Sequence, residues 1–248
     1  MKAVVIGASS GLGRCIGVGL AKRGAEVALL ARREDRLANA VAETEGRAHA
    51  IRCDVTDEAS CRTAIDTAAD KLGGIDSYVY AAGVGHLARL AETDADTWHN
   101  SFATNVVGAA LTTSAALPAL TEAKGNAIYL SSISASQTSP WPGLASYITS
   151  KAALERLVEC FRVEHPAVGF TRISVGDCAG GDGESMTEFP NQWDSELATE
   201  LGTMWFEKGY ITGTLLPVEE LIRVVDQVLR NDPGTSIPSM VVTPRPPA

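Results

Sequence analysis

Ala3-Val4-Val5-Ile6-Gly7-Ala8-Ser9-Ser10-Gly11-Leu12-Gly13-Arg14 is the stretch that decides the fold. A short run of apolar, β-branched residues ends in glycines and serines, and a helix-like pattern follows from Arg14 to Lys22. A strand, a glycine-rich turn and a helix in this order are typical of α/β proteins that bind a nucleotide phosphate. Glycine lets the phosphate approach the backbone, and the helix N-terminus offers unpaired N–H groups. The stretch therefore predicts a phosphate-binding turn; the alternative is a plain strand-to-helix connection.

The bulk composition indicates one α/β domain of an ordinary enzyme. The chain has 248 residues, 45% of them hydrophobic and 21% charged. A net charge of −9 disfavours binding to nucleic acid. The five cysteines form no C-x-x-C pair, so we expect reduced thiols, no metal site and a cytoplasmic location. We also expect no membrane span, because no apolar run approaches about 20 residues, and no signal peptide, because a strand begins near Met1.

Apolar runs alternate with stretches of helical period, which predicts a parallel sheet with helices on both faces. The fold class is therefore a single Rossmann-type, doubly wound α/β domain with a seven-stranded parallel sheet. The expected strands are Ala3–Ile6, Glu26–Leu30, Ala48–Cys53, Asp76–Ala81, Ala127–Leu130, Phe170–Val175 and Pro238–Val242. The expected helices are Arg14–Arg23, Arg33–Glu43, Glu58–Lys71, Thr97–Leu117 (followed by Pro118), Ala145–Val163 and Val218–Leu229 (with Pro217 in the first turn).

The segment 180–216 interrupts this alternation. It begins with Gly180, Gly181 and Gly183 and carries many large apolar side chains among acidic residues. A long insertion of this kind predicts a lid over the substrate. The alternative is an oligomer contact or a packed surface excursion.

The end of the second strand indicates which nucleotide is bound. An acidic residue at this position usually accepts hydrogen bonds from the ribose of NAD. Here Ala31 stands at the position, followed by Arg32 and Arg33. A guanidinium matches the geometry of a phosphate, so we expect NADP(H). Asp54, after the third strand, either accepts from the adenine amine or caps the next helix.

Tyr147 and Lys151 are the candidate catalytic pair. Residues four apart on a helix share a face, so the phenol and the ammonium should lie side by side. A neighbouring cation favours the phenolate, which should lower the pKa of Tyr147 from about 10 toward neutrality. Such a phenol can protonate a carbonyl oxygen in one direction and act as a base in the other.

With these motifs in place, the sequence resembles the short-chain dehydrogenase/reductase family over nearly the whole chain. Residues 7–13 match the family's T-G-x-x-x-G-x-G turn, except that Ile6 replaces the threonine, and Tyr147 and Lys151 match Y-x-x-x-K. Ser132, at the end of Ile128-Tyr129-Leu130-Ser131-Ser132, aligns with the catalytic serine, although Ser131 and Ser134 lie close to it. Asn105 matches the family asparagine, and Arg32 matches the basic position of NADP-preferring members.

The resemblance implies a role for each of these residues. Tyr147 would be the acid/base, Lys151 would lower its pKa and bind the nicotinamide ribose, and Ser132 would polarise the substrate oxygen. Asn105 would hold a helix kink and a water that links Lys151 to solvent; the alternative is a plain polar residue inside a helix. Cofactor contacts are expected from Tyr147 and Lys151 and from Gly7, Ser9, Ser10, Gly11, Leu12, Gly13, Arg32, Arg33, Asp54, Val55, Ala81, Ala82 and Gly83.

Three departures from the family pattern fall near the reaction site. The family's N-N-A-G reads Tyr80-Ala81-Ala82-Gly83 here, so support for the backbone at this point must come from elsewhere. The P-G after the sixth strand reads Cys178-Ala179. Ser132 and Tyr147 are 15 positions apart, more than is usual, with Pro140-Trp141-Pro142 between them.

The leading hypothesis is an NADP(H)-dependent oxidoreductase that acts on a small-molecule carbonyl or secondary alcohol. The alternatives are a cofactor-binding regulator without turnover and a non-redox member of the same fold, such as an epimerase or dehydratase. Trp141, Trp193 and Trp205 indicate an apolar or ring-bearing substrate. In the family, the two long helices form a dimer face, so we expect a homodimer or homotetramer.

Overall fold

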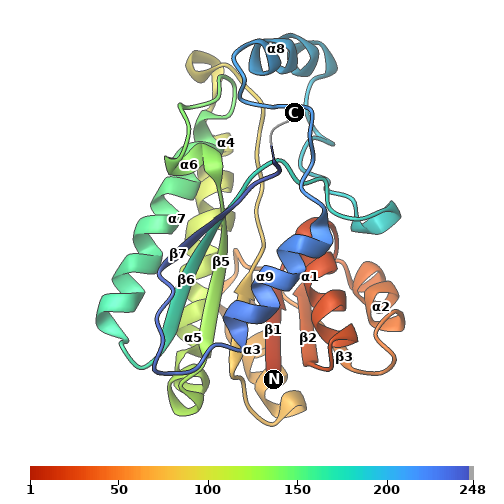
Figure 1. Cartoon of the computed structure of the whole chain (residues 1–248), viewed down its shortest axis with the longest axis vertical. Helices are drawn as coiled ribbons and strands as arrows, with labels where there is room; N and C mark the ends of the chain where they lie inside the picture. Colours follow the sequence, from red (N-terminus) through yellow and green to blue (C-terminus); the bar gives the residue numbers. More distant parts are fainter. Residues whose placement is uncertain (246–248) are drawn as a thin grey trace.

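In the computed structural model, which describes residues 1–245, a single parallel sheet organises the chain (Figure 1). The strands lie in the order β3-β2-β1-β4-β5-β6-β7, and every neighbouring pair is parallel. Their bounds are β1 (Lys2–Ile6), β2 (Glu26–Ala31), β3 (Ala48–Arg52), β4 (Ser77–Tyr80), β5 (Asn126–Ser132), β6 (Gly169–Val175) and β7 (Ser239–Val242). The predicted seven-stranded doubly wound sheet is confirmed.

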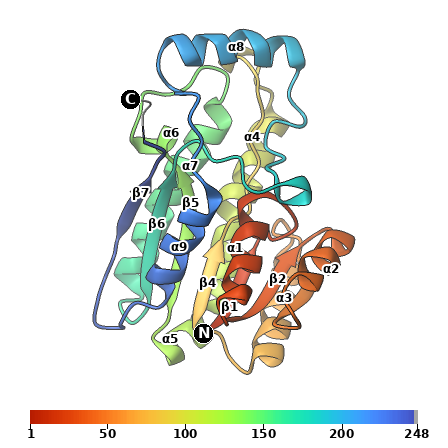
Figure 2. The same ribbon diagram turned by 45° about the vertical axis from the view of Figure 1, so that its right-hand side comes forward.

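Helices cover both faces of this sheet (Figures 1 and 2). The α-helices are α1 (Gly11–Lys22), α2 (Glu34–Ala42), α3 (Glu58–Leu72), α4 (Ala95–Phe102), α5 (Gly108–Ala123), α6 (Ile133–Ser136), α7 (Ala145–Glu164), α8 (Ser195–Glu207) and α9 (Val218–Leu229). The short 3₁₀ turns η1 (Leu90–Glu92) and η3 (Gly183–Ser185) and a π-helical turn, η2 (Ala103–Val107), complete the helical elements.

The core has two layers because the strands are apolar on both faces, as parallel strands usually are. On one side, α1, α2 and α9 pack on the sheet through residues such as Ile16, Leu37 and Val225. On the other, α3, α5 and α7 pack through residues such as Ile65 and Leu154. These two layers fix the carboxyl ends of β1, β4 and β5 side by side.

The fourth long helix differs from the expected Thr97–Leu117. It begins at Ala95, where the side chain of Asp94 caps the first turn by accepting from the Thr97 N–H at 2.8 Å. It passes through the π turn and continues beyond Pro118, which was expected to follow the helix, as far as Ala123. Pro118 is exposed, so water can satisfy the carbonyl that the proline leaves without a donor.

The expectation of no membrane span stays a prediction, because one helix passes a composition test for such a span. Within the described part of the chain, Ala95–Ala123 meets that test by length and composition, with a window of mean hydropathy 1.2. Core helices of soluble proteins pass the same test. In this helix Thr112 and Thr113 hydrogen-bond the buried hydroxyls of Tyr78 and Tyr129 at 2.7 and 2.8 Å, so one face is part of the core.

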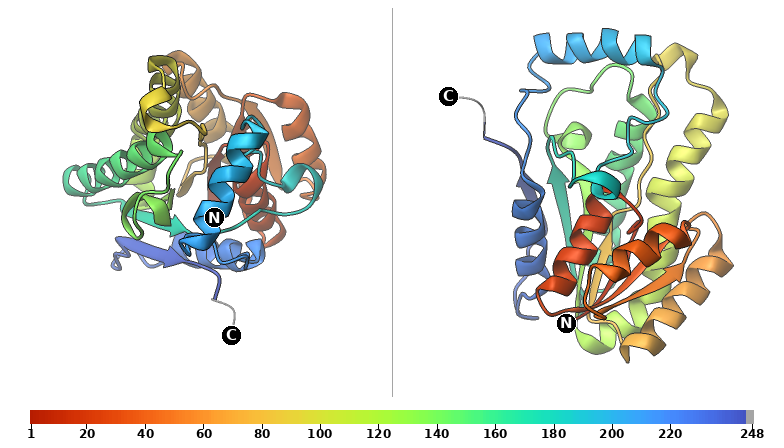
Figure 3. Two further views of the ribbon diagram at one scale, coloured as in Figure 1. Left: turned by 90° about the horizontal axis from the view of Figure 1, so that it is seen from above. Right: turned by 90° about the vertical axis from the view of Figure 1, so that its right-hand side faces the viewer.

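The segment 180–216 lies beyond the carboxyl ends of the strands (Figure 3). Its first part, residues 180–193, is called the strap below; a single antiparallel bridge between Gly180 and Met186 folds it back on itself. Its second part contains α8, which the sequence analysis missed. The signal for α8 was present, since the side chain of Asp194 caps the helix by accepting from the Leu197 N–H at 2.9 Å.

Candidate active site

A cleft of about 860 Å³ lies at the carboxyl edge of the sheet, where β1 and β4 are neighbours and the strand order reverses. Open α/β sheets bind their ligands at such a switch point. Every cofactor-contact residue predicted from the sequence lines this cleft, as do Ser132, Tyr147 and Lys151. Asn105 is fully buried behind the lining.

The glycine-rich turn has the geometry that a phosphate requires. Gly7 has a φ of +86°, and a Cβ there would lie 2.6 Å from the backbone of Ala82. A Cβ on Gly13 would lie 2.3 Å from the carbonyl oxygen of Gly7. Only glycine lets the turn close against the start of α1 in this way, and the N-terminal end of α1 then points into the cleft with its partial positive charge.

The two arginines after β2 lie in different parts of the cleft. The guanidinium of Arg33 donates to the hydroxyls of Ser9 and Ser10 at 2.8 and 2.7 Å. Both serines belong to the glycine-rich turn, residues 7–13, which is called the phosphate turn below. Arg32 lies nearer Asp54. Burial raises the pKa of Asp54, but hydrogen bonds from Thr56 and the charge of Arg32 outweigh it, so the pKa is lowered overall. Arg32 matches the family's basic position, but it is Arg33 that reaches the turn.

Asp54 is not the cap of the following helix. Its carboxylate accepts from the N–H and hydroxyl of Thr56 at 3.1 and 2.7 Å, which closes a local turn. The helix cap is Asp57, which accepts from the Ser60 N–H at 3.0 Å. Asp54 therefore remains on the wall of the cleft.

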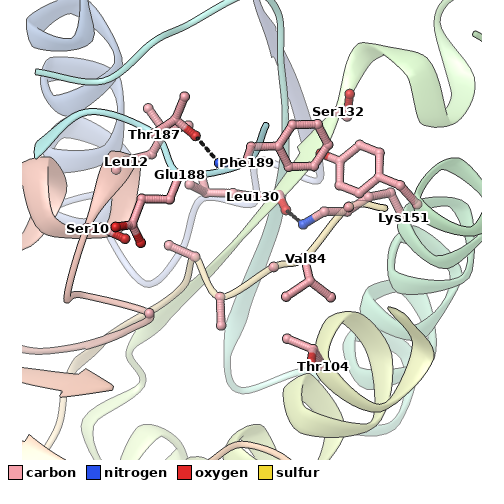
Figure 4. A pocket seen from close by; sticks show the side chains of 18 of the residues that line it. Ser10, Leu12, Val84, Thr104, Leu130, Ser132, Lys151, Thr187, Glu188 and Phe189 are labelled. Atoms are coloured by element: carbon pink, nitrogen blue, oxygen red, sulfur yellow. Dashed lines mark hydrogen bonds between the residues drawn. The ribbon is translucent and has the colours of Figure 1, made fainter. Parts of the chain in front are cut away.

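Tyr147 and Lys151 lie one turn apart on α7, with the Lys151 Nζ 5.8 Å from the centre of the Tyr147 ring. The ammonium donates to the carbonyl of Leu130 at 2.8 Å (Figure 4). Burial lowers the pKa of Lys151 to about 8, against the opposing charge of Glu155. An ammonium that is buried and only partly compensated releases its proton readily.

The expected lowering of the Tyr147 pKa is wrong for this arrangement. Burial raises the pKa of Tyr147 to about 12, and the neighbouring Ser132 opposes that rise only in part. The Lys151 ammonium is directed to a carbonyl rather than to the phenol oxygen, so its charge does not offset the loss of water. An i to i+4 spacing fixes which face the two residues share but not where the ammonium points.

The three neighbouring serines have different surroundings. Ser132 is the last residue of β5 and its hydroxyl lies 2.8 Å from that of Ser134, on the cleft side. Ser131 donates to the buried carboxylate of Glu155 at 2.7 Å. Ser131 is therefore hydrogen-bonded to α7. Ser132 is the serine whose side chain opposes the rise in the pKa of Tyr147.

Asn105 lies in the π-helical turn η2 and clamps the backbone after β4. Its Oδ1 accepts from the Val84 N–H at 2.8 Å, and its Nδ2 donates to the Val84 carbonyl at 2.9 Å and to the Ser150 hydroxyl at 2.8 Å. A π turn inside a helix frequently marks a functional site. The support that the missing N-N-A-G asparagine would give here comes in part from Asn105; its role in holding a water stays a prediction.

Tyr80, which departs from that motif, takes part in the same arrangement. Its buried hydroxyl donates to the carbonyl of Thr104, the residue before Asn105. Tyr80 thus ties the end of β4 to the π turn.

The strap brings two residues into the cleft that the sequence analysis did not name. The Glu188 carboxylate accepts from the guanidinium groups of Arg33 and Arg36, close to the phosphate turn. The ring of Phe189 packs edge-on against that of Tyr147, and Trp193 donates its indole N–H to the Gly85 carbonyl at 2.9 Å. Figure 4 shows Glu188 on the Ser10 side and Phe189 on the Lys151 side of the cleft. No local pattern marks these residues, because Glu188 pairs with an arginine 155 positions away and Phe189 packs on a residue of a different element.

Comparison with known proteins shows which family the chain belongs to. A family model described as short chain dehydrogenase matches residues 1–192. The chain therefore belongs to the short-chain dehydrogenase family, an oxidoreductase family whose fold binds a nicotinamide cofactor.

Particular relatives resemble parts of the chain. A short chain dehydrogenase of Pseudocercospora fijiensis is 34% identical over 70% of this chain and 57% of its own length. Farnesol dehydrogenase of Aedes aegypti is 32% identical over 72% of this chain and 76% of its own length. Among solved structures, an alcohol dehydrogenase from Thermococcus sibiricus complexed with 5-hydroxy-NADP superposes with a TM-score of 0.78 at 23% identity, covering 97% of this chain and 94% of that one. That identity supports the fold alone, and the chain spans little more than half of the first of these relatives.

Proposed function

We propose that this protein is an NADP(H)-dependent oxidoreductase that interconverts an apolar carbonyl compound and its secondary alcohol, with Tyr147 as the acid/base. One observation carries the proposal. The wall at one end of the cleft contains Ser132, Tyr147 and Lys151, and the other end contains Arg33 at the phosphate turn. Hydride chemistry needs a proton donor at one end of such a cleft and a nucleotide anchor at the other.

The residues at the anchor end fit a phosphorylated dinucleotide. Gly7 and Gly13 keep the turn free of Cβ atoms, and α1 offers its N-terminus to the pyrophosphate. Arg33 supplies a planar donor fork beside Ser9 and Ser10, which suits a 2′-phosphate better than a ribose hydroxyl. Ala31, at the end of β2, has no acceptor for the ribose.

A bound reduced nicotinamide supplies the hydride, which forms the new C–H bond at the carbonyl carbon. The chain's own residues handle the proton. Ser132 holds the carbonyl oxygen, and the Tyr147 phenol transfers its proton to that oxygen. To stabilise the phenolate that remains, the Lys151 ammonium turns from the Leu130 carbonyl toward the phenol oxygen. With its pKa lowered to about 8, Lys151 also exchanges protons readily at neutral pH, so it can restore the proton of Tyr147. The reverse reaction uses the same groups as bases.

An apolar substrate class is favoured by the walls around the catalytic end. A cluster separate from the two core layers combines Leu144, Ile148, Leu201 and Trp205 with the half-buried Trp141, Tyr147, Phe189 and Trp193. Burial of an apolar substrate against such walls contributes about 25 cal/mol per Å² of apolar surface. Segment 180–216 supplies several of these side chains, and we propose that it is the lid over the substrate.

The direct test is a panel of ketones, aldehydes and secondary alcohols incubated with the purified protein and either NADPH or NADP⁺. The absorbance of the reduced nicotinamide is followed. We expect turnover with apolar carbonyl compounds and slower turnover with small polar ones. A protein that binds the cofactor but consumes none across the panel would contradict the proposal and favour a regulator or a non-redox activity.

A further inference from the structure

We propose that Arg33 and Arg36 together form the clamp for the cofactor's 2′-phosphate, and that Glu188 of the strap is the anion which this phosphate displaces. The inference rests on the proposed use of NADP(H). It adds a second arginine to the anchor and makes the strap sensitive to the phosphate that distinguishes NADP(H) from NAD(H).

The Glu188 carboxylate is an anion that is already bound between the two arginines. One of its oxygens accepts from Arg33 and the other from Arg36, so each guanidinium binds one oxygen. Burial raises the pKa of Glu188, but the hydrogen bonds and charges of the two arginines outweigh this and lower it overall. A phosphate offers the same partners more oxygens and more charge, so it should compete well for both guanidinium groups.

The position of this anion matches the proposed anchor. Arg33 reaches Glu188 while it also binds the hydroxyls of Ser9 and Ser10 in the phosphate turn. Arg36 lies one turn further along, in α2. Glu188 lines the cleft, and the side chains of Arg36 and Glu188 are 29% and 28% exposed, so a ligand can reach both without unfolding α2.

Displacement of Glu188 has a consequence at the catalytic end because Phe189 is the next residue. Its ring lies against Tyr147, with 4.8 Å between centroids, and against the backbone of Gly85, where a Cβ would be 2.0 Å from the Phe189 ring. Between the two ends, Thr187 crosses the phosphate turn, with its Cα 3.4 Å from where a Cβ of Gly11 would be. A phosphate that takes the place of Glu188 on the arginines leaves Phe189 as the neighbouring contact that holds the strap against Tyr147. NAD(H) has no group to place on the arginines.

The strap has a second acidic anchor that serves as a control. Glu184 pairs with Arg14 at 3.2 Å and accepts from Asn39 at 3.1 Å. These contacts hold the same strap to α1 and α2 without involving the guanidinium group of Arg33 or of Arg36. Loss of the Glu184 charge should loosen the strap for every ligand alike, whereas loss of the Glu188 charge should favour ligands that carry the 2′-phosphate.

The test uses adenosine 2′,5′-bisphosphate and adenosine 5′-monophosphate, which differ only in the phosphate at issue. Calorimetric titration of each into the wild-type protein, Glu188→Gln, Glu184→Gln and Arg36→Gln gives eight dissociation constants and needs no turnover. We expect Glu188→Gln to tighten the bisphosphate about 2- to 5-fold, the range for partly exposed charge pairs, and to change the monophosphate less than about 2-fold. Arg36→Gln should weaken the bisphosphate selectively, and Glu184→Gln should leave the ratio of the two constants unchanged.

The outcomes separate the two proposals. If the wild-type protein binds both nucleotides equally and Glu188→Gln does not change this, the use of NADP(H) itself is wrong. If the wild-type protein prefers the bisphosphate but Glu188→Gln leaves the ratio unchanged, or Glu184→Gln changes it equally, then Glu188 does not compete with the phosphate. Unchanged bisphosphate binding in Arg36→Gln would remove Arg36 from the clamp.

Discussion

The ring of Phe189 stands edge-on to the ring of Tyr147, with 4.8 Å between the centroids and an interplanar angle of 63°. One residue belongs to the strap and the other to α7, so the contact joins the segment beyond the sheet to the candidate catalytic group. Phe189 takes part in the burial of the phenol, and that burial is the main cause of its raised pKa.

This contact predicts that Phe189→Ala lowers the pKa of Tyr147. Water that reaches the phenol should move the pKa from about 12 toward the free value of about 10. The measurement is an alkaline titration of tyrosinate absorbance, in which the signal of Tyr147 is isolated by subtracting a matched Tyr147→Phe protein. Phe206→Ala, at an exposed position of α8, is the control and should change nothing. A pKa that stays near 12 in Phe189→Ala would show that Phe189 does not exclude water from the phenol.

Lys151 should make stability depend on pH in the alkaline range. Its pKa is about 8 in the folded protein against 10.5 for the free side chain. Between these values the unfolded chain holds a proton that the folded protein lacks, so stability rises with pH across this window. The full rise corresponds to about 3 kcal/mol at most. Urea unfolding of the wild type and of Lys151→Met at the two ends of the window isolates this contribution. We expect the wild type to gain stability relative to the variant, and an unchanged difference would contradict the lowered pKa.

The sheet was predictable because each strand is a short apolar run bounded by turn residues or helical patterns. The glycine turn after Ile6 and the exact bounds of Val218–Leu229 follow from local signals alone. Pro118 lies inside the helix and not, as expected, after it. A helix tolerates an internal proline where that position is exposed to solvent, and the local sequence does not reveal this exposure. The helix α8 cannot be predicted from the aromatic residues of its segment, because they also fit a lid; its local signal is the cap at Asp194.

The residues that line the site were predictable from the sequence, but their pKa shifts and ion pairs were not. The spacing of Tyr147 and Lys151 placed both residues in the cleft. It did not reveal that the phenol and the ammonium are both buried, and this burial decides the direction of both pKa shifts. Glu188 was invisible for a related reason: a charge pair across 155 positions depends on how the strap folds.

The close approach at the phosphate turn predicts that Gly13→Ala destabilises the protein. The new methyl group would lie 2.3 Å from the Gly7 carbonyl oxygen and 3.2 Å from the Ala81 side chain. Forcing an extra methyl group into such a site costs about 1–3 kcal/mol. Gly202→Ala is the matched control, because nothing lies within 4 Å of its added Cβ, and it should stabilise α8 by up to about 1 kcal/mol. Urea unfolding measures both, and equal stabilities would show that the turn can relax.

The expected homodimer or homotetramer leads to a prediction about α5. Only 39% of the apolar window in Ala95–Ala123 is buried, and α5 lines a hollow with Leu111, Ala115 and Pro118 that it shares with charged residues of α3. A second copy of the chain would cover this face. Light scattering should give a mass of at least two 26.0 kDa chains, and Leu111→Arg should shift it toward the monomer. A monomer at micromolar concentration would contradict the prediction.

The most direct test of the proposed chemistry is the rate of hydride transfer in Tyr147→Phe, measured with NADPH and a carbonyl compound that the wild type reduces. The variant keeps the ring against Phe189 and removes only the transferable proton, so NADPH affinity should change little. We expect the rate to fall by about 10²- to 10⁴-fold, the range for general acid catalysis. A variant that retains near-normal turnover would contradict the role of Tyr147 as the acid/base.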